Sequence, residues 1–178
     1  MKPQIVTLLV LLGGQISNAQ CILGEAVKAQ LVEEWEMAKV MTDEYLNIMP
    51  ADKYNFKAQD SVRSFAQQML HIALVNNAMI SHGTGAPRIL PAQRRLEQSK
   101  SAQTKDSVIY FVNASYDFAI NAIKNMDASK LEEKVKVRTL ELTRFAWLLK
   151  AYAHQVHHRG QTAIYIRLVE VKPPKWLE

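Results

Sequence analysis

The chain has 178 residues, which is enough for one domain with its own hydrophobic core, and its 48% hydrophobic and 22% charged residues are ordinary for a globular protein. The formal net charge of +5 comes from basic residues spread along the chain, without a run of five or more and without interleaved aromatic residues. This pattern argues against a nucleic-acid partner in spite of a sequence pI of about 9.3.

The first twenty residues predict a cleaved export signal. Lys2 provides a short positive region, residues 5–12 form an apolar stretch too short to span a membrane, and Ser17 to Ala19 offer small residues at the cleavage positions. We therefore expect residues 1–20 to be removed. The mature domain, residues 21–178, is then periplasmic or secreted, without stable insertion in a membrane.

Cys21 is the only cysteine, so a disulfide within one chain is excluded. A lipoprotein signal requires a small residue just before the cysteine, and Gln20 is not small. We therefore do not expect lipid anchoring at Cys21. Export without disulfides is more typical of a bacterial periplasm than of a small disulfide-rich extracellular module.

Two helices are predicted in the first half of the mature chain, and no stretch of the sequence has the sustained alternation of a strand. The first helix extends from about residue 25 to 49 and ends at Pro50. The second extends from about residue 58 to 81. Residues 83–103 then hold two prolines and two glycines among many polar residues, which indicates one long connection.

Two more helices are predicted after this connection. The third extends from about residue 105 to 126 and is followed by a charged, irregular segment, 127–138. The fourth extends from about residue 139 to 171, where Pro173 and Pro174 stop it. Four amphipathic helices can bury their apolar faces only against one another, so we predict an all-α four-helix bundle with one long crossover connection.

Three of the five histidines fall within five positions near the C-terminus: His154, His157 and His158. Helical residues four apart share a face, so His154 and His158 can direct their imidazoles at one metal ion, and a spacing of three would also allow His157. On a helical wheel this pair lies in the predicted buried stripe, while Arg159 points to solvent. A shared metal would keep both buried rings neutral, but two hydrogen-bonded core histidines would have the same spacing.

A third ligand has to come from another helix, where His71 and His82 are the candidates. His82 adjoins a glycine at a helix end, which favours a solvated side chain. His71 lies in the middle of the second helix but opposite its apolar stripe, so periodicity alone does not nominate it. Gln161 and Tyr165 share the histidine face and are candidates to orient the ligands, although core packing is the main role expected of Tyr165.

Two fragments, Gln68-Met-Leu-His71 and His154-x-x-His157-His158-Arg-Gly-Gln161, followed by Tyr165-Ile-Arg167 and the two prolines, together resemble the DinB-like (DinB/YfiT) superfamily over nearly all of the mature chain. The resemblance implies a bundle with up-down-down-up topology, a homodimer, and a divalent metal ion, zinc or nickel. Carried over by position, the implied metal ligands are His71, His154 and His158. Glu170 stands where the family often has glycine, a departure that does not touch the ligand set.

Three imidazoles with an open coordination position form the ligand set of catalytic rather than structural zinc sites. The resemblance therefore implies a metal-dependent enzyme, either a hydrolase or a thiol-dependent S-transferase, acting on an unidentified small molecule. Export weakens the case for an activity that needs a cytosolic thiol, and no motif nominates a catalytic residue beyond the ligands. The alternatives are a non-catalytic bundle that binds a metal or small ligand, and a dimerisation module without metal.

Overall fold

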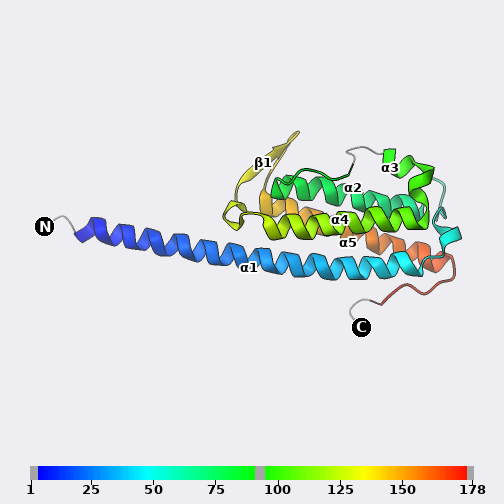
Figure 1. The fold of residues 1–178 in the computed structure, drawn as a ribbon, viewed down its shortest axis with the longest axis horizontal. Helices are drawn as coiled ribbons and strands as arrows, with labels where there is room; N and C mark the ends of the chain where they lie inside the picture. Colours follow the sequence, from blue (N-terminus) through cyan, green and yellow to red (C-terminus); the bar gives the residue numbers. More distant parts are fainter. Residues whose placement is uncertain (1–3, 91–94, 176–178) are drawn as a thin grey trace.

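The computed structural model describes residues 4–90 and 95–175, with side chains described from residue 22 onward except that of Arg95. This part of the chain forms a bundle of four long helices (Figure 1). They are α1 (Gln4–Ile48), α2 (Phe65–Thr84), α4 (Lys105–Asn125) and α5 (Arg144–Leu168). The predicted all-α four-helix bundle is confirmed.

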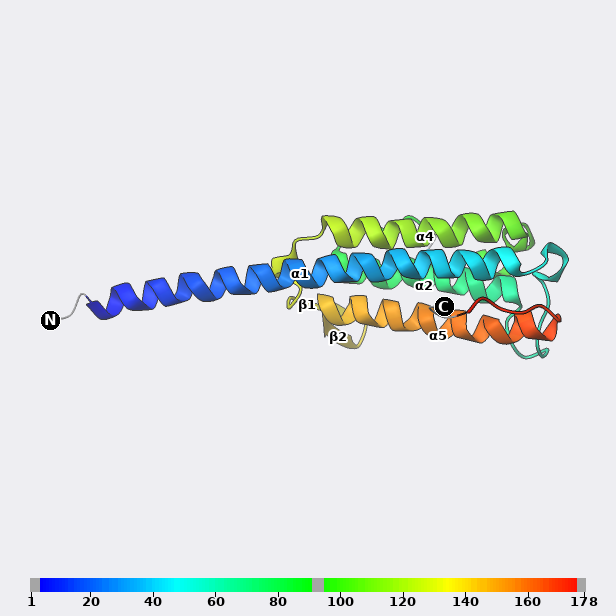
Figure 2. The same cartoon turned by 90° about the horizontal axis from the view of Figure 1, so that it is seen from below.

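Figures 1 and 2 show that α1 and α5 run in one direction along the bundle, while α2 and α4 run in the other. This is the predicted up-down-down-up topology. The long connection between α2 and α4 returns the chain along the bundle and carries two short helices, α3 (Arg95–Gln98) and the 3-10 helix η2 (Lys100–Gln103). Because α2 packs extensively on both α4 and α5, it is buried on most sides.

The start of α2 differs from the prediction because a capping box fixes it at Phe65. The Ser64 hydroxyl accepts from the backbone N–H of Gln67 at 3.2 Å, and the Gln67 side chain accepts from the backbone N–H of Ser64 at 2.9 Å. The preceding segment contains only the 3-10 helix η1 (Ala51–Lys53) and turns. This segment therefore lies as a loop over one end of the bundle (Figure 1).

A β-hairpin joins α4 to α5, so the prediction of no strands was wrong, as was a fourth helix beginning near residue 139. Strand β1 (Lys134–Val137) pairs antiparallel with β2 (Leu140–Thr143). The alternation of Lys134 to Val137 is too short to stand out from a charged segment by periodicity. Arg138, in the two-residue turn, has a φ of 55°, and Thr143 then caps α5 by accepting from the backbone N–H of Ala146.

Arg159 lies in the core, with 2% of its surface exposed, so the prediction that it points to solvent was wrong. Its Nη1 donates to the backbone oxygen of Ala38 at 3.1 Å, to Thr42 Oγ1 at 3.3 Å and to Gln155 Oε1 at 3.1 Å. The buried centre of α5 thus passes through Gln155 and Arg159. The helical wheel predicted that the buried face of α5 is centred on the histidines. They lie instead on the flank of α5, beside α2.

The predicted export signal falls mostly outside the described part of the chain. Residues 1–3 and the side chains of residues 4–21 belong to the undescribed part, so the division into residues 1–20 and 21–178 stays a prediction. The backbone of α1 continues from the bundle to Gln4 and projects beyond the other helices (Figure 1). Within the described residues, no helix is both long and apolar enough to cross a bilayer.

Candidate metal centre

Three histidines from two helices meet on the flank between α2 and α5. His71 comes from α2, and His154 and His158 come from successive turns of α5, with one nitrogen of each ring within 4.8 Å of the others. The ring centroids are 4.3 Å apart for the α5 pair, and His71 lies 5.1 Å from His154 and 4.7 Å from His158. All three side chains are half-buried. These are the predicted ligand residues, and the structure brings all three together.

Glu97, which nothing in the sequence nominated, orients the ring of His71. Its Oε1 lies 2.8 Å from Nδ1 of His71, and its Oε2 accepts from Nε of Arg63 at 3.0 Å. Burial acts to raise the pKa of Glu97, but hydrogen bonds with His71 and Arg63 outweigh it and hold the pKa below its usual value. An ionised carboxylate only accepts hydrogen bonds. Nδ1 of His71 therefore carries the hydrogen, so Nε2 is the nitrogen with which this ring could bind a cation.

Two glutamines hold the ring of His158 from the other side. The Gln68 amide nitrogen lies 3.0 Å from Nδ1 of His158 and also donates to the oxygen of Gln161. Gln161 therefore lies next to both Gln68 and His158. Its own nitrogen lies 3.1 Å from Nε2 of His157, which is exposed and does not belong to the group of three converging nitrogens in the described structure.

The two remaining candidates from the sequence lie outside this group. Tyr165 is buried and its hydroxyl donates to the backbone oxygen of Arg63 at 2.8 Å, so it packs in the core and anchors the loop before α2. His82 lies near the other end of α2, where it contacts Arg88 at 3.1 Å and the ring of Trp147 at 5.1 Å between centroids. Neither side chain supplies a nitrogen or oxygen to the three-histidine group.

The surroundings of the α5 pair favour neutral imidazoles. Burial lowers the pKa of His154 to about 3, and the neighbouring ring of His158 adds to the effect. Burial, with a smaller contribution from His71, lowers the pKa of His158 to about 4. Nδ1 of His154 is buried and has no hydrogen-bond partner among the described residues. Buried ring nitrogens normally have a partner, so neutral rings with an unpaired nitrogen fit a donor set for a metal ion.

An open cleft of about 600 Å³ lies beside the group of three histidines and is lined by one of them, His158. One wall comes from the loop before α2 and the first turn of that helix, including Val62, Arg63 and Gln68. The other wall comes from the C-terminal half of α5, including Ile164. The cleft gives a small molecule access to the candidate metal centre.

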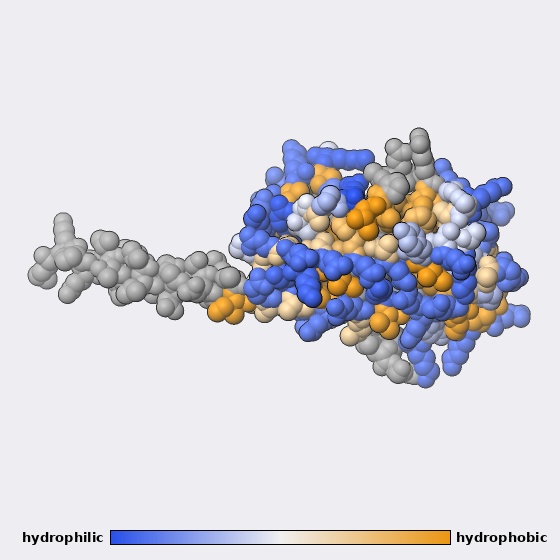
Figure 3. Space-filling view, in the orientation of Figure 1, coloured by the Kyte–Doolittle hydropathy of each residue, from blue (hydrophilic) through white to orange (hydrophobic). Residues whose placement is uncertain are grey.

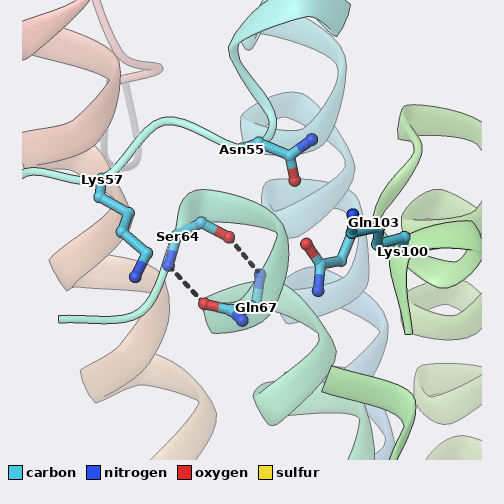
Figure 4. Close-up of a pocket in the computed structure, with 6 residues that line it drawn as sticks. All are labelled: Asn55, Lys57, Ser64, Gln67, Lys100 and Gln103. Carbon is cyan, nitrogen blue, oxygen red and sulfur yellow. Dashed lines mark hydrogen bonds between the residues drawn. The ribbon is translucent and has the colours of Figure 1, made fainter. Parts of the chain in front are cut away.

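A second cavity, of about 430 Å³, contains no histidine. Figure 4 shows it around the start of α2, with Lys57 on one side and Lys100 and Gln103 on the other. The dashed lines in Figure 4 are the capping hydrogen bonds between Ser64 and Gln67, which already use these groups. The cleft beside His158 is therefore the better candidate for a substrate site.

Comparison with known proteins identifies one family and several similar solved structures. The sequence model of the DinB family matches residues 20–176. A DinB-like protein from Bacillus cereus has a TM-score of 0.70 at 14% identity, over 82% of this chain and 95% of that one. A DinB-like protein from Bacillus subtilis, YjoA, has a TM-score of 0.62 at 16% identity, over 84% and 97% of the two chains. A search of curated proteins finds no match. At these identities the structural likeness shows a shared fold.

Proposed function

The chain belongs to the DinB family, and from that membership and the geometry of its histidines we propose that it binds one divalent metal ion through His71, His154 and His158. The observation that carries the proposal is the convergence of three ring nitrogens from two helices. The buried, unpaired Nδ1 of His154 and the Glu97 carboxylate behind His71 support it further. Imidazole nitrogens suit zinc and nickel, the two ions we expect.

We propose further that the protein is a metal-dependent enzyme, either a hydrolase or a thiol-dependent transferase. Three protein ligands leave coordination positions for other groups, as in catalytic zinc sites, and a divalent cation bound there supplies Lewis-acid chemistry. Glu97 would fix the ring of His71, and the cleft would orient a small-molecule substrate beside His158.

A non-catalytic role in binding a metal or small ligand is the second candidate. Its support is the composition of the cleft: no carboxylate is among the described side chains that line it, and the nearby Glu97 already accepts from His71 and Arg63. The mature chain, residues 21–178, would act outside the cytoplasm in either case. The N-terminal sequence is the support for that location.

Metal analysis of the mature protein, purified without a histidine tag, tests the proposed site. We expect about one zinc or nickel ion per chain in the wild type and a large loss in His158→Ala. His157→Ala is the matched control, because His157 is adjacent and exposed, and it should keep its metal. Less than about 0.3 metal per wild-type chain, unchanged in His158→Ala, would rule the site out.

A further inference from the structure

We propose that the cleft beside His158 takes a small molecule with a carboxylate group next to a short apolar part, and that Arg63 binds the carboxylate. This inference rests on the metal-dependent function proposed above, since the cleft would present the substrate to that site. It adds a substrate class and a specificity-determining residue.

The charge of the cleft is the first support. Arg63 is the only charged side chain among the described residues that line it. Apart from the ring of His158, the other described side chains that line the cleft are uncharged. A divalent cation at the three histidines would add positive charge nearby. Glu97 offsets part of the charge of Arg63 from behind, but it does not line the cleft, so the charged groups that face the cleft favour an anionic ligand over a cationic one.

The position of the Arg63 side chain is the second support. Its Nε donates to Glu97 and its backbone oxygen accepts from Tyr165, so both ends of the residue are held. In the described structure, its two terminal nitrogens make no hydrogen bond, and 37% of the side chain is exposed. A guanidinium held in this way can donate two parallel hydrogen bonds to a carboxylate with little further loss of side-chain entropy.

The proximity of Arg63 to the candidate metal centre is the third support. Glu97 accepts from Arg63 and from His71, so the anion-binding group lies one carboxylate away from a proposed metal ligand. The amides of Gln68 and Gln161 line the same cleft beside His158. A carboxylate bound at Arg63 would thus leave a neighbouring polar bond of the same small molecule close to the histidines.

The apolar wall specifies the rest of the ligand. Val62 is 39% exposed and Ile164 is 58% exposed, and both line the cleft. Large apolar side chains left open to solvent inside a cleft are typical of a surface that a ligand covers. A short hydrocarbon segment between the carboxylate and the reacting bond fits this wall.

Calorimetric titration of the metal-loaded protein with hexanoate and with hexanamide tests the inference. The two probes share their apolar chain and differ in charge, so we expect hexanoate to bind about tenfold or more tightly than hexanamide. Arg63→Met should weaken hexanoate binding by about ten- to hundredfold and leave hexanamide binding nearly unchanged. Arg167→Met, at an exposed arginine of α5 outside the cleft, is the control and should bind both probes like the wild type.

Metal content, measured on every sample, separates the two possible failures. A wild-type protein that takes up no metal contradicts the proposed function and, with it, this inference. Full metal content with equal affinity for the two probes overturns the carboxylate site alone, and this comparison needs no variant. Full metal content with undiminished hexanoate binding in Arg63→Met would show that the anion binds the metal directly and that Arg63 does not select it.

Discussion

Glu97 connects the two halves of the proposed site. Its buried carboxylate accepts from the ring of His71 and from the guanidinium of Arg63, so one side chain fixes a metal ligand and the cation of the cleft. Carboxylates behind histidine ligands raise the basicity of the ring and set its tautomer. The strength of metal binding should therefore depend on a residue that does not touch the metal.

The first prediction concerns this residue. Glu97→Gln keeps the size of the side chain but removes its charge, so we expect the metal affinity to fall by about 10- to 100-fold. Competition with a chromogenic chelator measures the affinity. Glu132→Gln, at an exposed glutamate, is the control and should match the wild type. Equal affinities in both variants would mean that Glu97 does not orient His71 for binding.

The second prediction concerns the pH dependence of the metal-free protein. Burial lowers the pKa of His154 to about 3 and that of His158 to about 4, whereas both titrate near 6.5 in the unfolded chain. Between these values the unfolded state binds more protons than the folded state, so stability is lost as the pH falls from about 6.5 towards 4.

Thermal unfolding at pH 7 and pH 5, with a chelator present, measures this loss. In His154→Gln, the difference between the two pH values should shrink. In His157→Gln, at the exposed neighbouring position, it should not change. A metal-free wild type that is equally stable at both pH values would contradict neutral, half-buried rings.

The residues of the site were predictable to different degrees. His154 and His158 stand out because a spacing of four puts them on one face of a helix. His71 required the family resemblance, since the wheel placed it opposite the apolar stripe. It is nevertheless half-buried, because α2 is covered on several sides. Glu97 could not be predicted, because the crossover connection brings it to His71 from 26 residues away, without any periodic signal.

At the scale of the elements, periodicity predicted α4 to within one residue and misplaced the starts of α1, α2 and α5. The backbone of α1 begins at Gln4 and not near residue 25, a capping box sets the start of α2, and a short hairpin occupies the residues predicted to begin α5. The wheel for α5 was centred on its histidines, although the helix buries the side chains of Gln155, Arg159 and Thr162. Polar side chains in a core cannot be recognised by an apolar pattern.

The third prediction follows from the buried Arg159. Because this side chain connects α5 to α1 by hydrogen bonds to Ala38 and Thr42, Arg159→Ala removes these buried hydrogen bonds and creates a void. We expect the free energy of unfolding to fall by about 2–4 kcal/mol, measured by urea denaturation. Arg167→Ala, at an exposed position of the same helix, should change it by less than about 0.5 kcal/mol. Similar values for the two variants would contradict the buried network.

For the whole molecule, the up-down-down-up topology is what allows the site to form. It makes α2 and α5 antiparallel neighbours, so the first half of α2, with His71, lies beside the middle of α5, where the histidine pair lies (Figures 1 and 2). It also requires the crossover connection that carries Glu97. The four helices and the crossover were predictable from sequence, whereas the order of the helices came from the family resemblance.

The fourth prediction is a homodimer of the mature chain, which the family resemblance implies. Figure 3 shows polar side chains over much of one face of the bundle, with apolar side chains among them. Several large apolar side chains are exposed on the helices, including Val40 at 61% and Tyr110 at 67%. Light scattering should give twice the mass of the mature chain. The mass of a single chain at micromolar concentration would argue against a stable dimer.

The most direct test of the central proposal is a crystal structure of the metal-loaded protein, with anomalous diffraction measured at the absorption edge of the bound ion. We predict one anomalous peak per chain, bonded to one nitrogen each of His71, His154 and His158 at about 2.0–2.1 Å for zinc. Glu97 should remain hydrogen-bonded to His71 behind it. A peak that involves His157 in place of His158, or one that lies away from the flank between α2 and α5, would contradict the proposed site.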